Sequence, residues 1–241
     1  MDSNHKPYDY QASFRRIREI LGQPDVAYEE TKTLPDRDRL TFTNGFYAYC
    51  CALFIDIRDS ASLPSKHRRP TLARLYRAYL SEVVAILNSD TSCREVNIVG
   101  DGAWAVYNTP GKADLDRLFV LAARLNSMIK AFNRELARAG ISPVRVGIGL
   151  SYGRALMIKA GYNGSGLSDV VYMGDVVNEA AHLAAQGNET ADDKTAMLSS
   201  VFVQNLKDAH QALVTWRTSR GCWHGDMIMP DMDKWYEANL A

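Results

Sequence analysis

The stretch VNIVGDGAWAVYN, residues 96–108, decides the fold because it predicts a hairpin of two apolar strands. Valine, isoleucine, tryptophan and tyrosine fill both sides of Gly-Asp-Gly, and these β-branched and aromatic residues favour strands. The two glycines permit a tight reversal between the strands. Asp101 therefore lies at the tip of the predicted hairpin, where a lone aspartate is ordinary turn chemistry.

A second aspartate stands at the end of another apolar stretch. CALFIDIRDS, residues 51–60, predicts a strand in which Asp56 comes just before a polar Arg-Asp-Ser. An ionised carboxylate among apolar residues is costly unless it is paired or bound to a metal. Because Asp56 and Asp101 stand at the ends of two such strands, a shared divalent cation is the simplest partner for both.

Composition excludes several classes of protein. The 241 residues include 28 basic and 28 acidic side chains, and this balance argues against a nucleic-acid or acidic-membrane binder. The 46% apolar content is typical of a globular domain. The four cysteines lack metal-binding spacing, which favours a reduced, cytoplasmic protein. The longest apolar run, residues 46–55, is too short to span a membrane, and the first residues lack the apolar core of a signal peptide.

Helical and strand patterns alternate around the hairpin. The patterns predict a strand at 46–57, a helix at 71–88 after Pro70, the hairpin at 96–108, a helix at 113–139 that Gly140 ends, and a strand at 144–150 with one apolar face. This is the ferredoxin-like βαββαβ order, an α+β fold with a mixed, mostly antiparallel sheet and helices on one face. In that order the first strand lies beside the hairpin, so we expect Asp56 and Asp101 to converge.

The rest of the chain extends this unit at both ends. Residues 1–40 predict an N-terminal helix at 11–22 and a polar wrapping arm, and the main domain covers residues 41–241. After the unit, the sequence predicts strands at 154–160 and 170–173 joined by a glycine-rich loop, a helix at 174–186 with Asp175 as its N-cap, and a final hairpin within 212–229.

Three motifs in chain order resemble the class III nucleotidyl cyclase catalytic domain over roughly residues 47–215. FIDIRDS at 54–60 is similar to the family's xDIxGFT, although its last three residues differ. GDGAWAV at 100–106 is similar to GDxxMA, and GDVVNEAAH at 174–182 is similar to GDxVNxAxR. Each motif alone is weak, but the three together, separated by matching elements, are specific.

The resemblance implies a nucleotidyl cyclase catalytic domain at 41–241. In such a domain the ribose 3′-hydroxyl of a nucleoside triphosphate attacks its own α-phosphate, and pyrophosphate leaves. The resemblance further implies two divalent ions, Mn²⁺ or Mg²⁺, in each site, because two ions stabilise the attacking and leaving oxygens. Asp56, Asp101 and the main-chain carbonyl of Ile57 match the family's metal ligands.

Further residues match the family's substrate contacts. The small Ser60 and its turn are suited to phosphate oxygens, and Arg145 matches an arginine that binds the polyphosphate in some cyclases. The alternative for Arg145 is a surface arginine on an exposed strand face. Asn178 matches the asparagine that orients the ribose, and His182, on the same helix face, replaces an arginine that stabilises charge at the α-phosphate.

The exchange at residue 182 leaves two interpretations open. A histidine supplies positive charge only when it is protonated, and the alternative is a partly buried histidine with one hydrogen bond.

Class III sites form between two protomers arranged head to tail, with the metal ligands from one and the Asn178-type residues from the other. A homodimer with two composite sites is therefore implied.

The base-binding positions depart from those of purine cyclases. Asn97 stands where those enzymes carry lysine or glutamate, and Val171, beside Tyr172, replaces their aspartate or threonine. Aromatic residues on the first strand, Tyr49 and Phe54 among them, narrow the expected pocket. A small pocket with a neutral amide fits a pyrimidine and resembles the bacterial pyrimidine cyclases of the Pycsar phage-defence systems.

The resemblance to pyrimidine cyclases implies conversion of UTP into 3′,5′-cyclic UMP, a second messenger read by a separate effector protein. UTP is preferred to CTP only because cyclic UMP is that family's commoner product, since an asparagine can turn to suit either base. Cytidylate cyclase and adenylate cyclase remain alternatives. An inactive nucleotide-sensing module is the alternative from another class: the missing arginine favours it, and the retained Asp56, Asp101 and Asn178 oppose it.

Overall fold

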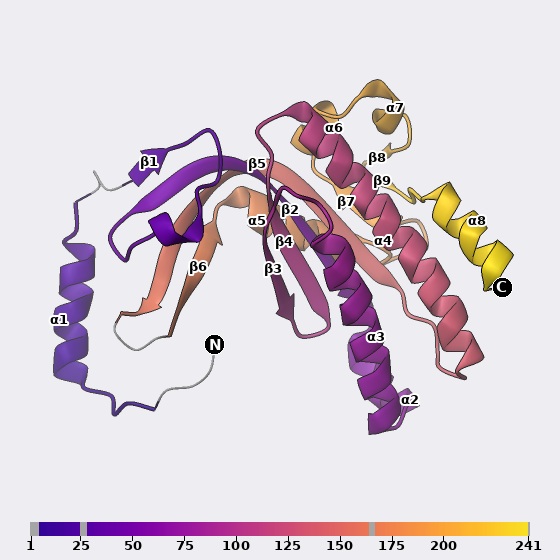
Figure 1. The fold of residues 1–241 in the computed structure, drawn as a ribbon, viewed down its shortest axis with the longest axis horizontal. Helices are drawn as coiled ribbons and strands as arrows, with labels where there is room; N and C mark the ends of the chain where they lie inside the picture. The colour runs from indigo at the N-terminus through magenta and orange to yellow at the C-terminus, as the bar shows by residue number, and fades with distance from the viewer. Residues whose placement is uncertain (1–4, 25–27, 164–166, 241) are drawn as a thin grey trace.

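The chain was analysed as a computed structural model that describes residues 5–24, 28–163 and 167–240 (Figure 1). The described strands form one sheet in the order β3-β4-β2-β5-β7-β9-β8, with β1 beside β2 and β6 beside β5. Their bounds are β1 Tyr28–Glu30, β2 Gly45–Ile57, β3 Cys93–Val99, β4 Gly102–Asn108, β5 Val146–Tyr162, β6 Leu167–Met173, β7 Ala196–Leu198, β8 Thr215–Arg217 and β9 Cys222–Gly225.

Eight α-helices and two short 3₁₀ turns complete the described chain. Their bounds are α1 Tyr10–Leu21, η2 Arg37–Arg39, η3 Ser60–Ser62, α2 Leu63–Lys66, α3 Arg69–Leu87, α4 Lys112–Arg138, α5 Asp175–Gln186, α6 Ser200–Gln204, α7 Asp208–Gln211 and α8 Pro230–Asn239. No helix in the described ranges is long and apolar enough to cross a membrane.

The predicted βαββαβ order is confirmed by β2, α3, β3, β4, α4 and β5. Strand β2 lies between β4 and β5 and is antiparallel to both. Strands β3 and β4 form the predicted hairpin around a two-residue turn, in which Gly100 has a φ of 62°. Glycine adopts this left-handed conformation without strain, and the turn places Asp101 at the hairpin tip.

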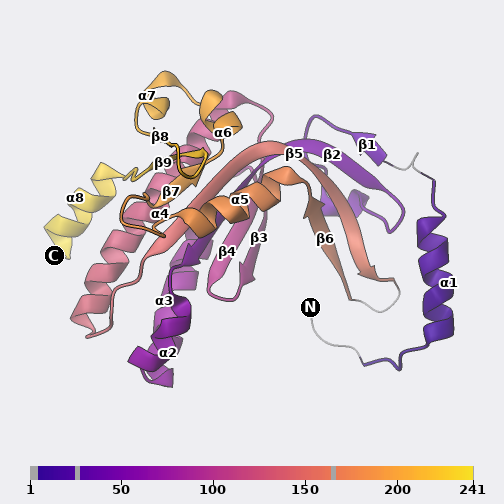
Figure 2. The same cartoon turned by 180° about the vertical axis from the view of Figure 1, so that it is seen from behind.

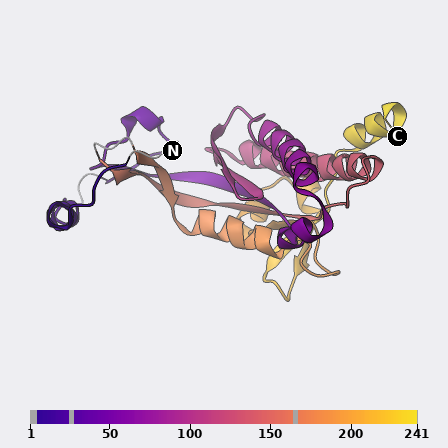
Figure 3. The same ribbon diagram turned by 90° about the horizontal axis from the view of Figure 1, so that it is seen from below.

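Helices cover the central sheet on both faces (Figure 3). The crossover helices α3 and α4 pack on one face, as predicted, and α5 packs on the other. The neighbours Cys50 and Cys51 show the result, because both are fully buried although they point into different cores. Burial on both faces explains why β2 is a nearly continuous apolar run and not an alternating one.

Glycines allow α5 to lie directly on β5. A Cβ at Gly147 would stand 2.0 Å from the Ala184 carbonyl oxygen, and one at Gly149 would stand 2.0 Å from that of Ala180. The sequence predicts a single apolar face for residues 144–150. The opposite face, which carries Gly147 and Gly149, is buried too, because the backbone of α5 packs directly against it.

The structure corrects several predicted boundaries. The predicted strands at 144–150 and 154–160 are one strand, β5, which begins at Val146 and pairs with β2 without interruption from Ile158 to Val146. The N-cap of α5 is Gly174, with a φ of 142°, and not Asp175. The final hairpin is confirmed as β8 and β9, whereas β7, α6 and α8 were not predicted. The glycine-rich loop before β6 includes residues 164–166, which lie outside the described residues.

The N-terminal helix α1 lies at one end of the molecule (Figures 1 and 2), where Arg16 stacks over the Tyr162 ring at the end of β5, 4.5 Å from its centroid. The following segment does join the sheet, because β1 pairs with β2 in parallel and Leu34 and Leu40 are buried against the α5-side core. The described part of the predicted arm is therefore packed on the domain. The boundary at residue 40 stays a prediction.

Candidate active site

The structure brings Asp56 and Asp101 together where the central strand β2 ends, beside the turn between β3 and β4. Strand β2 pairs Ile55 with Ala103 of β4, which places Asp56 beside the hairpin turn. A Cβ added to Gly102 would lie 2.7 Å from Asp56 Oδ1, so the approach depends on glycine at this position. The two aspartates are also close enough for the charge of Asp101 to act on Asp56.

The electrostatics of this pair are unfavourable without a cation. Burial, followed by the charge of Asp101, raises the pKa of Asp56, and Arg58 opposes the shift only partly. Asp101 Oδ2 is buried without a hydrogen-bond partner among the described residues. Carboxylate oxygens in this setting fit Mg²⁺ or Mn²⁺, which bind hard oxygen ligands and complete their coordination with substrate phosphates and water. No group of three acidic, histidine or cysteine side chains suited to a metal occurs in the described chain.

Arg58 connects the acidic pair to the end of α5. Its Nη2 atom lies 3.4 Å from Asp56 Oδ2, and its Nη1 atom donates a hydrogen bond of 2.6 Å to the Ala185 carbonyl oxygen. The buried Nε atom has no hydrogen-bond partner in the described chain. Sequence analysis treated Arg58 only as a departure from the family motif, although its place two residues after Asp56 was a signal that it would reach the site.

Arg145 lies against the turn that follows β2. Its guanidinium makes an ion pair of 2.8 Å with Asp59 and donates a hydrogen bond of 3.2 Å to the Asn188 carbonyl oxygen. Asp59 has a left-handed φ of 55° and precedes the η3 turn that Ser60 begins. The structure therefore places Arg145 and Ser60 at the turn that follows Asp56 and Ile57 of β2, and their contacts with phosphate stay predictions.

A cleft opens between β2, β4 and α5 next to the acidic pair. Its volume is about 260 Å³, and its lining includes Phe54, Asp56, Trp104, Ala181 and Ala185. The Phe54 and Trp104 rings are stacked, with centroids 5.3 Å apart and an interplanar angle of 5°. Clefts of about 310 and 600 Å³ occur elsewhere, but neither Asp56 nor Asp101 lines them.

Three predicted base-binding residues gather on this face of the sheet. Strand pairing places Asn97 opposite Trp104, which is itself opposite Phe54, and directly opposed residues share a face. The Tyr172 ring meets Trp104 edge to face, at 6.5 Å. Sequence analysis missed Trp104 and Glu95, which accepts a hydrogen bond of 3.0 Å from Asn97 Nδ2. For Glu95 the available signal was its spacing of two residues from Asn97 along β3, which places both side chains on one face.

Tyr49 does not belong to this cluster, which corrects the prediction that it lines the base pocket. It stacks on Tyr152, with ring centroids 5.7 Å apart, and Tyr152 packs on the α3 and α4 side of the sheet. Side chains alternate along a strand, so an odd-numbered residue of β2 faces away from Phe54 and Asp56. The Tyr49 side chain is also 48% exposed.

Asn178 and His182 lie on the exposed side of α5, on the same helix face as Ala181 and Ala185 of the cleft. Neither side chain makes a hydrogen bond or ion pair within the described ranges, and neither contacts the aspartate pair in this way. Because His182 is exposed, the interpretation of a partly buried, hydrogen-bonded histidine is wrong. One chain thus presents the acidic pair and the asparagine without joining them.

Comparison with known sequences agrees with this arrangement. Residues 44–215 match the family of adenylate and guanylate cyclase catalytic domains. A uridylate cyclase of Gulbenkiania mobilis is 43% identical over 190 residues, which cover 76% of this chain and 73% of that protein. A uridylate cyclase of Treponema porcinum is 33% identical over 233 residues, which cover 97% of this chain and 78% of that protein. The resemblance drawn from the three motifs is confirmed.

Solved structures show the same fold. A class III adenylyl cyclase-like ATP-binding protein from Pseudomonas aeruginosa has a TM-score of 0.70 at 19% identity; the match covers 94% of this chain and 50% of that one, so this chain spans half its length. The adenylyl cyclase CyaB from P. aeruginosa has a TM-score of 0.60 at 18% identity, with 72% and 86% covered. The predicted α+β class III fold is confirmed by these likenesses.

Proposed function

Because this chain belongs to the family of adenylate and guanylate cyclase catalytic domains, we propose that it is a uridylate cyclase, which converts UTP into 3′,5′-cyclic UMP and pyrophosphate. The observation that carries this proposal is the convergence of Asp56 and Asp101 at the mouth of a cleft that the stacked Phe54 and Trp104 line. The two relatives named uridylate cyclase support the choice of base.

In the proposed reaction the ribose 3′ oxygen bonds to the α-phosphorus, the bond from that phosphorus to the pyrophosphate oxygen breaks, and the hydroxyl proton passes to solvent. Asp56, Asp101 and the Ile57 carbonyl would hold two Mn²⁺ or Mg²⁺ ions, which when bound stabilise the attacking and leaving oxygens. Arg145 and the turn at Ser60 contact the phosphates in this proposal. Arg145 already pairs with Asp59, so a polyphosphate would compete for it.

The proposed active unit is a homodimer with two composite sites. Asn178 and His182 of one copy would reach the substrate held by the acidic pair of the other, with Asn178 orienting the ribose. The exposure of both side chains and their lack of partners within the described chain support this arrangement. His182 contributes charge at the α-phosphate only in its protonated form.

The proposed biological role is that of a cytoplasmic enzyme in bacterial defence against phage. Cyclic UMP would serve as the second messenger and a separate effector protein would read it, with neither nucleic acid nor membrane as a partner. The resemblance to pyrimidine cyclases supports this role. Plaque assays on bacteria that carry the gene beside its neighbouring effector gene test it, and D101A should abolish protection.

Product analysis tests the chemistry. Purified protein is incubated with Mn²⁺ and ATP, GTP, CTP or UTP in separate reactions, and products are identified by mass. Cyclic UMP that disappears in D101A supports the proposal. Cyclic CMP or cyclic AMP as the main product would replace the substrate but retain the reaction, whereas binding of a triphosphate without turnover would indicate a sensor module.

A further inference from the structure

We propose that Glu95 positions the Asn97 amide so that the site accepts one pyrimidine and rejects the other, an inference that rests on the proposed uridylate cyclase function. Glu95 lies two residues before Asn97 on β3, and its side chain is only 6% exposed. Asn97 Nδ2 donates a hydrogen bond of 3.0 Å to Glu95 Oε1. The pair lies on the sheet face that carries Phe54 and Trp104.

A carboxylate fixes the direction of this amide because it has no proton to donate. Asn97 must therefore turn its NH₂ group toward Glu95, and its Oδ1 atom remains free to accept a hydrogen bond. Arg37 stabilises the charge of Glu95 from the other side, with Nη1 3.4 Å from Oε2, although that oxygen has no hydrogen bond in the described chain. A flipped amide would place two acceptors against each other, which leaves buried polar groups unpaired.

The fixed amide distinguishes the bases because uracil and cytosine present opposite patterns of hydrogen-bond donors and acceptors at ring positions 3 and 4. Uracil has a carbonyl oxygen at position 4 and an N–H at position 3. Cytosine has an amino group at position 4 and an unprotonated nitrogen at position 3. With the ribose and phosphates holding the ring in place, one amide orientation pairs with uracil and the reverse orientation pairs with cytosine. On the proposed function, Asn97 Oδ1 accepts the uracil N3–H.

The neighbours of Glu95 support its role as a fixed acceptor. Burial and then the charge of Glu95 raise the pKa of Tyr172, so the phenol stays protonated beside the carboxylate. Arg37 also pairs with Asp169, which does not touch Asn97. Asp169 therefore offers a matched control: its replacement disturbs the same arginine without removing the acceptor that orients the amide.

The test compares kcat/KM for UTP and for CTP in wild type, E95Q, E95D and D169N. Glutamine can either accept from Asn97 or donate to it, so E95Q admits both amide orientations, and we expect the UTP to CTP ratio to fall about tenfold, the effect of one charged hydrogen bond. E95D keeps an acceptor-only group and should retain the preference at lower activity. D169N should change the ratio less than about twofold.

A second background shows whether Glu95 acts through Asn97. The UTP to CTP ratio of the double variant N97A/E95Q should lie within about twofold of the ratio of N97A, because N97A has already removed the amide that Glu95 orients. The ratio compares two substrates in one preparation, so partial unfolding of a variant cancels. An unchanged ratio in E95Q, or an equal fall in the N97A background, would overturn this inference alone. No cyclic pyrimidine from wild type would overturn the proposed function and this inference together.

Discussion

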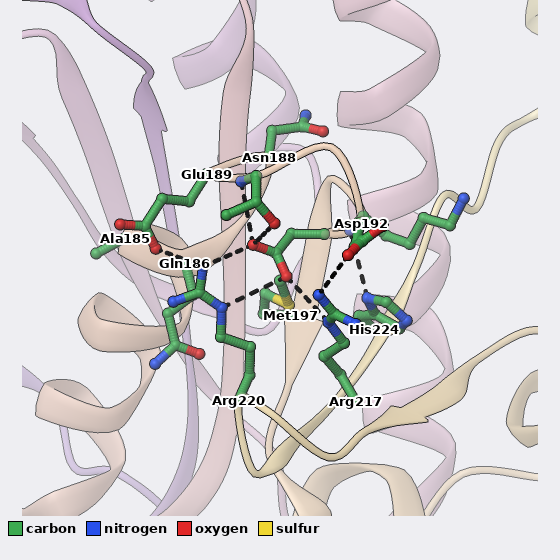
Figure 4. A network of polar contacts seen from close by, with 12 residues as sticks. Ala185, Gln186, Asn188, Glu189, Asp192, Met197, Arg217, Arg220 and His224 are labelled. Atoms are coloured by element: carbon green, nitrogen blue, oxygen red, sulfur yellow. Dashed lines mark hydrogen bonds and ion pairs between the residues drawn. The ribbon is translucent and has the colours of Figure 1, made fainter.

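The side chain of Asp193 is fully buried, whereas the acidic pair Asp56 and Asp101 is partly exposed, and the two sites have opposite electrostatic surroundings. Asp193 accepts hydrogen bonds from Arg220 at 2.7 Å, Arg217 at 3.2 Å and Thr190 at 2.7 Å. Figure 4 shows Arg217 and Arg220 pointing into this polar network, beside the labelled Asp192 and Asn188. These contacts, that of Arg220 first, hold the pKa of Asp193 well below its usual value. At the acidic pair, burial and the second carboxylate raise the pKa of Asp56.

The comparison separates a carboxylate that serves the fold from a pair that we propose to bind metal ions. Asp193 is satisfied by its own chain, and it ties the loop between α5 and β7 to the β8–β9 turn. The same loop supplies the Asn188 carbonyl to Arg145, and the end of α5 supplies the Ala185 carbonyl to Arg58. Asp193 therefore supports the framework, whereas Asp56 and Asp101 lack such compensation within the described chain, which is why we propose a cation as their partner.

The largest expected effect is on activity and concerns the acidic pair. D101N should lower the rate of cyclic nucleotide formation about a hundred- to a thousandfold, because the loss of one preorganised electrostatic group of an active site has an effect of this size. Mass-resolved product formation with Mn²⁺ measures it. D36N, which changes an exposed aspartate paired with Arg94, is the control and should retain the wild-type rate. Full activity in D101N would show that the acidic pair is not needed for the reaction.

The second effect is on stability and concerns Asp193. D193A should lower the free energy of unfolding by about 4 kcal/mol, since it leaves the buried ends of Arg217 and Arg220 without their shared partner. Chemical denaturation monitored by circular dichroism measures this loss. D192N, at a neighbouring aspartate that is 79% exposed, should change stability by less than about 1 kcal/mol. Equal effects at both positions would contradict the structural role of Asp193.

The pH dependence of stability should reveal the depressed pKa of Asp193. A carboxyl group whose pKa is lowered in the folded state stabilises the protein above its unfolded pKa, near 3.8, and this contribution is lost as the pH falls toward the folded value. The stability difference between wild type and D193N should therefore be constant near neutral pH and shrink below about pH 4. Denaturation of both proteins across this range measures it, and a difference that grows in acid would be the contrary result.

The smallest expected effect concerns the acidic pair without metal. D56N should raise the free energy of unfolding by about 1 kcal/mol or less at neutral pH in a chelator, because it removes repulsion at a partly exposed site. Added Mn²⁺ should stabilise wild type and leave D56N nearly unchanged. Thermal melts with chelator and with Mn²⁺ measure both effects. If D56N is less stable than wild type in chelator, the two carboxylates are not in conflict.

Much of the fold was predictable because it depends on periodicity. The long helices and the strands of the βαββαβ unit each carry a repeating apolar pattern, and their order alone implies that Asp56 meets Asp101. Side-chain alternation along β2 also indicates that Tyr49 faces away from Asp56, because the two residues are an odd number of positions apart. The network of Asp193 was not predictable, because the charged residues in the loops around it show no periodic pattern that identifies partners.

The sequence by itself determined the family, the central strand order and the position of the two aspartates, since these follow from local pattern and from three motifs in fixed order. The tertiary structure alone decided that α5 lies on Gly147 and Gly149, that Asn97 donates a hydrogen bond to Glu95, and that Arg58 reaches Asp56. Each of these depends on which face a side chain occupies and how closely two backbones approach. Both are settled by packing between elements far apart in the chain, which no local pattern encodes.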